Sequence, residues 1–98
     1  TTLTMAAAHS NGLAIACANR VGTERGQPFI GQSVIVGGDG WPLAGPASHD
    51  REEVLYATID LTSTRAQRTL NDFNHVMRDR RADVYDPMLG TGWPSSEV

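Results

Sequence analysis

The sequence predicts a small mixed domain of the α/β (α+β) class, with about four strands and one or two outer helices. Three observations predict it: helix formers open the chain, short apolar segments follow, and glycines and prolines separate those segments. Of the 98 residues, 40% are hydrophobic and 19% are charged, which is typical of a globular protein. A chain of this length buries only about 60–65% of its unfolded surface, so its margin of stability is small.

The first predicted element is a helix. Residues 3–10 are good helix formers, and Asn11-Gly12 supplies the left-handed residue that commonly ends a helix. We therefore predict the end of a helix at residues 1–11.

The segment LAIACA, residues 13–18, predicts the first strand. Large side chains and Cys17 alternate with three alanines, so both faces are apolar. We therefore expect this strand to be central in its sheet and Cys17 to be buried. A reactive thiol needs a nearby cation or helix N-terminus and an access path. Neither is evident around Cys17, so it is predicted to be a packed core residue rather than a nucleophile.

A long loop and a hairpin are predicted next. Residues 19–31 contain several glycines and a proline, and they make a longer loop than a simple connection needs. Residues 33–36 predict a second strand, a Gly38-Asp39-Gly40 turn follows, and residues 41–44 predict a short third strand.

The last elements are a strand and a short helix. Residues 53–60, EVLYATID, predict a fourth strand. The carboxylate of Asp60 can cap a short surface helix that begins at Leu61. Residues up to 86 are predicted to be irregular, and residues 87–98 form a tail that we expect at an oligomer interface.

Charge and composition narrow the classes of function. Eleven acidic and eight basic residues give a net charge of −3, so we expect no nucleic-acid partner. All eight basic residues are arginine, which excludes from this chain any mechanism that needs a lysine amine. The lone cysteine forms no internal disulfide, so we expect a cytoplasmic protein. We also expect no membrane segment, and the opening TTLTMAAAHSNG is typical of the middle of a domain rather than a signal peptide.

The loop after the first strand holds the strongest candidate site residues. Asn19, Arg20 and Glu24 occur where an apolar strand gives way to a glycine-rich loop, which is a common place for site residues in α/β proteins. One interpretation is that Arg20 and Glu24 form an ion pair that orders the loop, and the spacing favours this one. The other is that Glu24 or Asn19 contacts substrate or orients a catalytic group.

Other polar residues have simpler interpretations. The three histidines are too scattered for a zinc motif, so we expect neither a metal nor a cofactor. Ser33 lacks the Gly-x-Ser-x-Gly surroundings of a nucleophilic serine and is expected to bond to the backbone. Asp79, Arg80 and Arg81 lie among further acids and are predicted to form a structural ion-pair network.

Several ordered blocks of the sequence resemble one known family. The blocks are NGLAIACANRVGTERGQPFIGQSVIVGGDGWPLA, then EEVLYATIDL, then RDRRADVY. Together they resemble the C-terminal part of the nitrilase superfamily, the carbon–nitrogen hydrolases, over residues 1–86. Gly38 and Ala82 stand where prolines are common in that family, and both positions are in loops.

The resemblance implies a fold, an activity and a set of site residues. Members fold as an α-β-β-α sandwich and hydrolyse non-peptide carbon–nitrogen bonds with a Glu-Lys-Cys triad. The triad lies upstream of the resembling segment, so no catalytic residue is expected in this chain, and the absence of lysine agrees with that. By resemblance, the residues that line or brace the site are Asn19, Arg20, Glu24, Phe29 and Ser33.

Three functions stay open at this point. The resemblance favours an amidase that cleaves an aliphatic amide or an N-carbamoyl amine and releases ammonia, because VGTERG and DRR look most like that branch. A nitrilase that converts a nitrile to an acid is the alternative enzyme, and a non-catalytic assembly subunit or fragment is the alternative of another class. The expected partners are a small-molecule substrate, the remainder of the catalytic domain and further copies of the chain.

Overall fold

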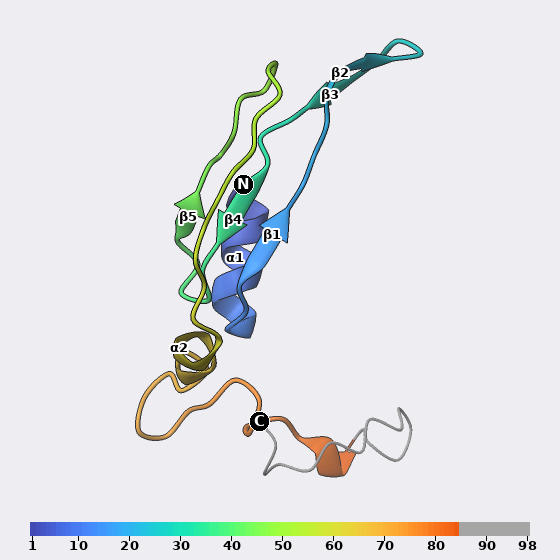
Figure 1. The fold of residues 1–98 in the computed structure, drawn as a ribbon. Helices are drawn as coiled ribbons and strands as arrows, with labels where there is room; N and C mark the ends of the chain where they lie inside the picture. The colour runs from blue at the N-terminus through green and yellow to red at the C-terminus, as the bar shows by residue number, and fades with distance from the viewer. Residues whose placement is uncertain (85–98) are drawn as a thin grey trace.

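The computed structural model describes residues 1–84, which contain the helices α1 and α2, a helical turn at residues 82–84 and five short strands in an α/β arrangement (Figure 1). Helix α1, Thr2–Asn11, ends at Gly12, whose φ of 58° is left-handed. This confirms the helix predicted at residues 1–11 and its glycine stop. Within the described residues, no helix is long and apolar enough to cross a bilayer.

A three-stranded antiparallel sheet lies against α1. Its order is β1–β4–β5, from β1 (Ile15–Cys17), β4 (Val34–Val36) and β5 (Pro42–Ala44). The predicted hairpin is confirmed, because β4 pairs with β5 and the backbone N–H of Gly37 donates to the carbonyl of Trp41 at 2.9 Å. The Asp39 carboxylate accepts from the backbone N–H of Trp41 at 3.0 Å and so stabilises the turn.

The prediction of a central first strand with a buried cysteine was wrong for the described residues. β4 occupies the middle of the sheet and β1 lies at its side, paired with β4 alone. Cys17 is exposed. An apolar alternation shows that both faces of a strand can be buried, but it cannot show which element covers them.

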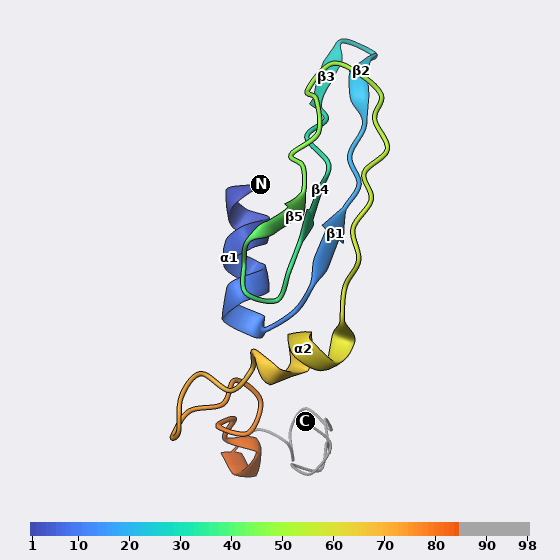
Figure 2. The same ribbon diagram turned by 60° about the vertical axis from the view of Figure 1, so that its left-hand side comes forward.

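The predicted loop at residues 19–31 is mostly a second antiparallel hairpin. Strand β2, Val21–Glu24, pairs with β3, Gln27–Ile30, and Figure 2 shows the pair projecting beyond the end of the main sheet. The two turn residues, Arg25 and Gly26, both have positive φ, at 51° and 81°. The glycines and proline that suggested a loop instead serve this turn and a sheet that has only two strands.

The prediction of a fourth strand at residues 53–60 was wrong, because these residues form no hydrogen-bonded strand within the described part of the chain. Residues 52–60 are extended (Figure 1), but no strand pairing among residues 1–84 includes them. The short helix that follows is confirmed as α2, Leu61–Ala66. The Asp60 carboxylate caps it by accepting from the backbone N–H of Thr62 at 2.9 Å.

The core between α1 and the sheet is small. Ala8, Val34 and Val36 are buried, and Met5 and Ile15 pack against them. Many large apolar side chains remain exposed, and the radius of gyration is 17.2 Å, against about 13 Å for a compact chain of this length. These residues therefore have little burial of their own to oppose the entropy of folding.

Residues 71–81 are irregular, as predicted, and they are ordered by His75. The side chain of His75 is buried, and its Nδ1 accepts from the backbone N–H groups of Met77 and Arg78 at 3.1 and 3.2 Å. The tail predicted at residues 87–98, with its interface role, lies outside the described residues, as do residues 85 and 86.

Candidate functional site

The end of β1 is tied to the start of β4 by Asn19 and Ser33. The Ser33 hydroxyl accepts from the backbone N–H of Asn19 at 2.9 Å and donates to the Asn19 carbonyl at 3.3 Å. The Asn19 side-chain amide donates to the Gly31 carbonyl at 2.9 Å. We call this set of contacts between Asn19, Gly31 and Ser33 the clasp. It fixes the place where the hairpin β2–β3 leaves the main sheet.

Beyond the clasp, Arg20 interacts with two side chains of the hairpin. Its guanidinium donates to the Glu24 carboxylate, and the two side chains are 52% and 55% exposed. The same guanidinium carbon lies 4.3 Å from the centre of the Phe29 ring. The ion pair predicted from spacing is therefore present, on the surface of the hairpin. Exposed pairs add little stability, so the ring contact and the pair together serve to fix the position of Glu24.

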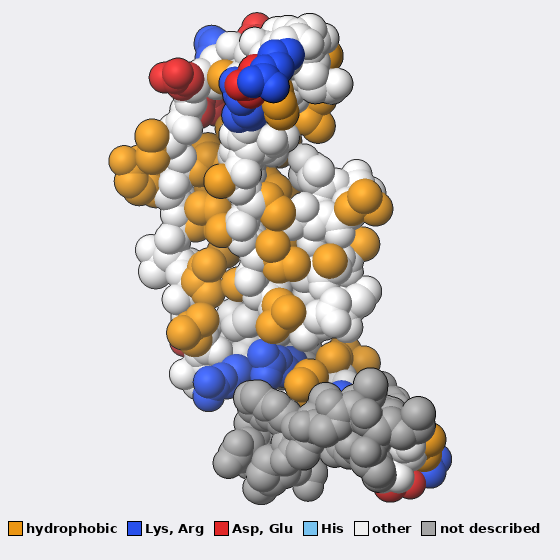
Figure 3. Space-filling model, turned by 90° about the vertical axis from the view of Figure 1, so that its right-hand side faces the viewer, with side chains coloured by type: hydrophobic (Ala, Val, Ile, Leu, Met, Phe, Trp, Pro, Cys, Tyr) orange, Lys and Arg blue, Asp and Glu red, His pale blue; other side chains and the backbone are white. Residues whose placement is uncertain are grey.

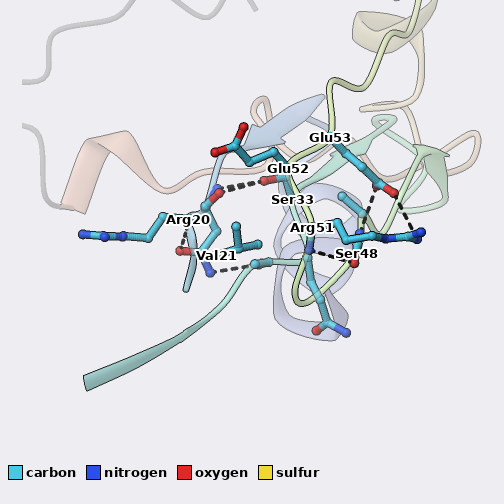
Figure 4. A pocket seen from close by; sticks show the side chains of 11 residues that line it. Arg20, Val21, Ser33, Ser48, Arg51, Glu52 and Glu53 are labelled. Carbon is cyan, nitrogen blue, oxygen red and sulfur yellow. Dashed lines mark hydrogen bonds and ion pairs between the residues drawn. The ribbon is translucent and has the colours of Figure 1, made fainter. Parts of the chain in front are cut away.

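A polar hollow of about 330 Å³ opens beside the clasp (Figure 4). Three predicted site residues line it, namely Asn19, Arg20 and Ser33, while Glu24 and Phe29 do not. Figure 4 shows the Arg20 side chain pointing away from the other labelled residues, toward the outside of the hollow. Figure 3 shows charged side chains of both signs gathered at this end of the molecule. The described part of the site is thus polar and contains opposite charges in close proximity.

The far wall of the hollow comes from residues 47–53, none of which was predicted as a site residue. The Glu53 carboxylate accepts from the backbone N–H of Ser48 at 2.9 Å and lies 3.8 Å from the Arg51 guanidinium. The Ser48 hydroxyl donates to Asp50 at 2.6 Å. This hydrogen bond, followed by the nearby His49, holds the pKa of Asp50 below its ordinary value. The acid-rich run after Ser48 was the available sequence signal for this wall.

The remaining predicted residues lie elsewhere. Asp79 accepts from the backbone N–H of His75 at 2.8 Å, and Arg80 donates to the Met77 carbonyl at 3.2 Å. Arg81 makes two hydrogen bonds to Asp83, at 2.8 and 2.7 Å, which lower the pKa of Asp83 and raise that of Arg81. Asp79, Arg80 and Arg81 are thus each bonded locally, and the only ion pair among their described contacts is the one between Arg81 and Asp83.

The sulfur of Cys17 lies 3.5 Å from the Thr4 hydroxyl oxygen. Across residues 1–84, no three side chains of histidine, cysteine, aspartate or glutamate gather as metal ligands would.

We expect Asn19→Ala to destabilise the folded protein by about 1–2 kcal/mol, because the Gly31 carbonyl loses its donor and the backbone N–H of Arg20 loses its acceptor, the Asn19 side-chain oxygen. Gln27→Ala is the matched control, since the side-chain amide of Gln27 has only one hydrogen bond within residues 1–84, to the neighbouring Pro28 carbonyl at 3.2 Å. That change should stay within about 0.5 kcal/mol. Urea unfolding of both variants measures the difference, and equal midpoints would show that the clasp carries no stability.

The fold and the site together define an α/β protein whose polar site is built where strands end and loops begin. Residues 1–69 match the family described as carbon-nitrogen hydrolase, and the chain belongs to that family.

Three relatives illustrate the match. Over 68 residues, the chain is 46% identical to a nitrilase of Pyrococcus abyssi, covering 69% of this chain and 25% of that protein. Over 87 residues, it is 31% identical to a probable nitrilase of Schizosaccharomyces pombe, covering 89% and 31%. A crystal structure of a carbon-nitrogen hydrolase from Helicobacter pylori superposes with a TM-score of 0.70 at 40% identity, covering 90% of this chain and 31% of that one. The chain thus spans between a quarter and a third of the length of these relatives.

Proposed function

We propose that this chain forms one wall of the active site of an enzyme that hydrolyses an aliphatic amide or an N-carbamoyl amine and releases ammonia. The observation that carries the proposal is the polar hollow at the strand ends. Its near wall is fixed by the clasp, and Arg20 connects it to Glu24 on the hairpin. Membership of the carbon-nitrogen hydrolase family supplies the reaction class.

The proposed chemistry is acyl transfer through a covalent thioester. A cysteine thiolate attacks the carbonyl carbon, the tetrahedral oxyanion collapses, and the leaving nitrogen departs as ammonia after taking a proton from a glutamic acid. Water, deprotonated by the same glutamate, then attacks the thioester, so that the carboxylic acid product and the thiol are released. A lysine ammonium stabilises each oxyanion. Since this chain has no lysine, the proposal assigns the Glu-Lys-Cys triad to the remainder of the catalytic domain.

In this proposal the chain's own residues hold the wall of the active site in position, and they take no part in forming or breaking bonds. The clasp keeps the Asn19 and Ser33 backbone rigid at the wall of the hollow, and the Arg20 guanidinium holds the Glu24 carboxylate in one place. A wall fixed in this way helps to hold a small substrate in the geometry needed for attack.

A nitrile is the second candidate substrate, because two relatives carry the name nitrilase. Hydrolysis of a nitrile consumes two waters and gives the acid and ammonia by the same thioester route. The alternative of another class is an assembly subunit without catalysis. The small core is the observation that supports it, because a chain with so small a core gains most of its stability from partners. We further propose a homo-oligomer in the cytoplasm, because a reducing compartment keeps a lone cysteine in its free thiol form.

Two measurements on the natively purified protein test the proposal. Intact mass should exceed the 10.5 kDa of this chain, or a second chain should copurify with it. Ammonia release should then be measured with simple amides, N-carbamoyl amines and nitriles. Turnover of nitriles alone would favour the second candidate, and a lone 10.5 kDa species would exclude catalysis by this mechanism.

We expect Cys17→Ala to leave the rate of ammonia release within about twofold of the parent. Among residues 1–84, the Cys17 sulfur is within hydrogen-bond distance of the Thr4 hydroxyl alone, and Cys17 does not line the polar hollow beside the clasp. Measurement of kcat for the parent protein and for Cys17→Ala tests this prediction. A folded Cys17→Ala variant without activity would place the nucleophile in this chain.

A further inference from the structure

Gln32 has a backbone conformation that favours glycine. Its φ is 57°, and Gly31 before it has a φ of 59°, so two left-handed residues follow each other directly after strand β3. A Cβ atom makes this conformation unfavourable, and the short polar side chains of asparagine and aspartate tolerate it better than the longer glutamine. Glycine adopts it without strain. The chain therefore carries a side chain at position 32 at a cost in stability.

Three hydrogen bonds hold Gln32 and Gly31 in this conformation. The backbone N–H of Gln32 donates to the Ser48 carbonyl at 3.1 Å, and that of Gly31 donates to the Arg20 carbonyl at 2.9 Å. The Gly31 carbonyl accepts from the Asn19 side-chain amide at 2.9 Å, as part of the clasp. Strained backbone persists only where its surroundings fix it, and it is concentrated at functional sites. The conformation of Gln32 therefore points to a role for its side chain.

Gln32 stands on the border between two hollows. It lines the polar hollow of about 330 Å³ beside the clasp (Figure 4), and it also lines a neighbouring hollow of about 260 Å³. Asn19 and Gly31 line both hollows as well, so the two hollows meet at this turn of the chain. Gln32 is exposed. Its side chain is therefore accessible to a small molecule that enters the polar hollow.

The carboxamide of Gln32 has no bond to the wall that it belongs to. Among residues 1–84, the polar side chains of the polar hollow that lack a hydrogen-bond or ion-pair partner are those of Gln32 and Glu52. A carboxylate such as Glu52 only accepts hydrogen bonds, whereas a carboxamide donates through its nitrogen and accepts through its oxygen. Within the described wall, Gln32 alone has both kinds of bond left to offer a ligand.

We propose that Gln32 is a specificity-determining residue of this enzyme, which selects substrates that carry an amide or N-carbamoyl group. Its side-chain nitrogen donates to the carbonyl oxygen of the substrate, and its side-chain oxygen accepts from an N–H group of the substrate. A nitrile has no N–H group, so it can make only one of the two bonds. The inference rests on the proposed function, because it places the substrate in the polar hollow.

Gln32→Gly in the natively purified protein tests the inference. The change removes the carboxamide and relieves the left-handed strain, so the urea midpoint should stay equal or rise. KM for an amide or an N-carbamoyl amine should rise at least about fivefold, while kcat stays within about twofold. Gln32→Met keeps a long side chain without the two bonds, and it should raise KM by a similar factor. Gln27→Met is the matched control, because Gln27 lies on β3 and lines neither hollow. It should leave KM unchanged.

The results separate the inference from the proposed function. A lower urea midpoint in Gln32→Gly would show that the side chain stabilises the fold, and it would overturn the inference. A KM that rises in Gln32→Gly but not in Gln32→Met would assign the effect to the backbone, with the same consequence. An unchanged KM in both variants of a parent that hydrolyses amides overturns the inference and leaves the function standing. A parent that hydrolyses neither amides nor N-carbamoyl amines overturns the function, and the inference with it, before any variant is compared.

Discussion

Replacing Gly31 with alanine is expected to lower the free energy of unfolding by about 3 kcal/mol or more. Gly31 has a φ of 59°, and a Cβ there would lie 2.6 Å from the Ser48 carbonyl oxygen and 2.7 Å from a methyl carbon of Val21. The carbonyl is backbone and accepts from the N–H of Gln32 at 3.1 Å, so it cannot move without loss of that bond. The backbone strain of an alanine at positive φ and the clash of its Cβ with Ser48 and Val21 both lower the free energy of unfolding.

The matched control is Gly22→Ala. Gly22 also has a positive φ, at 91°, but its added Cβ would meet no atom within 4 Å. We expect it to cost only about 1 kcal/mol, from backbone conformation alone. Urea denaturation of both variants measures the difference, which isolates the clash at the wall of the hollow. Equal losses would mean that the close approach of Gly31 to Ser48 is not tight in solution.

Replacing Glu24 with glutamine is expected to lower kcat at least tenfold while it changes the free energy of unfolding by less than about 1 kcal/mol. The pair that it forms with Arg20 is half exposed, so its loss weakens the fold little. A neutral amide in place of the carboxylate removes the negative charge at this end of the site and gives Arg20 a poorer acceptor. In the proposed enzyme, activity then falls because the carboxylate of Glu24 no longer holds Arg20 in place beside the hollow.

Asp72→Asn is the control for this change, because Asp72 is an exposed acid remote from the hollow. It should leave kcat unaltered. Ammonia release and urea unfolding are measured on both variants. If Glu24→Gln lowers stability and activity in the same proportion, Glu24 acts only as a scaffold, which is the other interpretation of the spacing.

The helices α1 and α2 and the β4–β5 hairpin could be predicted because their signals are local. Gly12 ends α1, Asp60 caps α2, and the Gly38-Asp39-Gly40 turn joins β4 to β5. Each depends on hydrogen bonds or dihedral angles within a few residues, which the sequence encodes directly. The contact of Arg20 with Glu24 is of the same kind, since the two residues are only four positions apart in the sequence.

The second hairpin was missed because its composition is ambiguous. Glycine and proline are depleted in ordinary strands, but Gly22 and Pro28 are tolerated here since β2 and β3 form an exposed two-stranded pair, and Gly26 lies in the turn between them. The wall at Ser48 and Glu53 was missed for a different reason. Its residues meet the clasp only after the chain has turned back from β5.

The sequence by itself determined the family, the local elements and most of the clasp residues, because ordered motifs and short-range bonds survive in a linear reading. Only the tertiary structure decided that β4, rather than β1, is central and that Cys17 is exposed. It also decided that residues 53–59 lie across the sheet without a strand partner among residues 1–84. The physical reason is that burial and strand pairing are relations between distant segments, while an apolar pattern records only that a face is able to be covered.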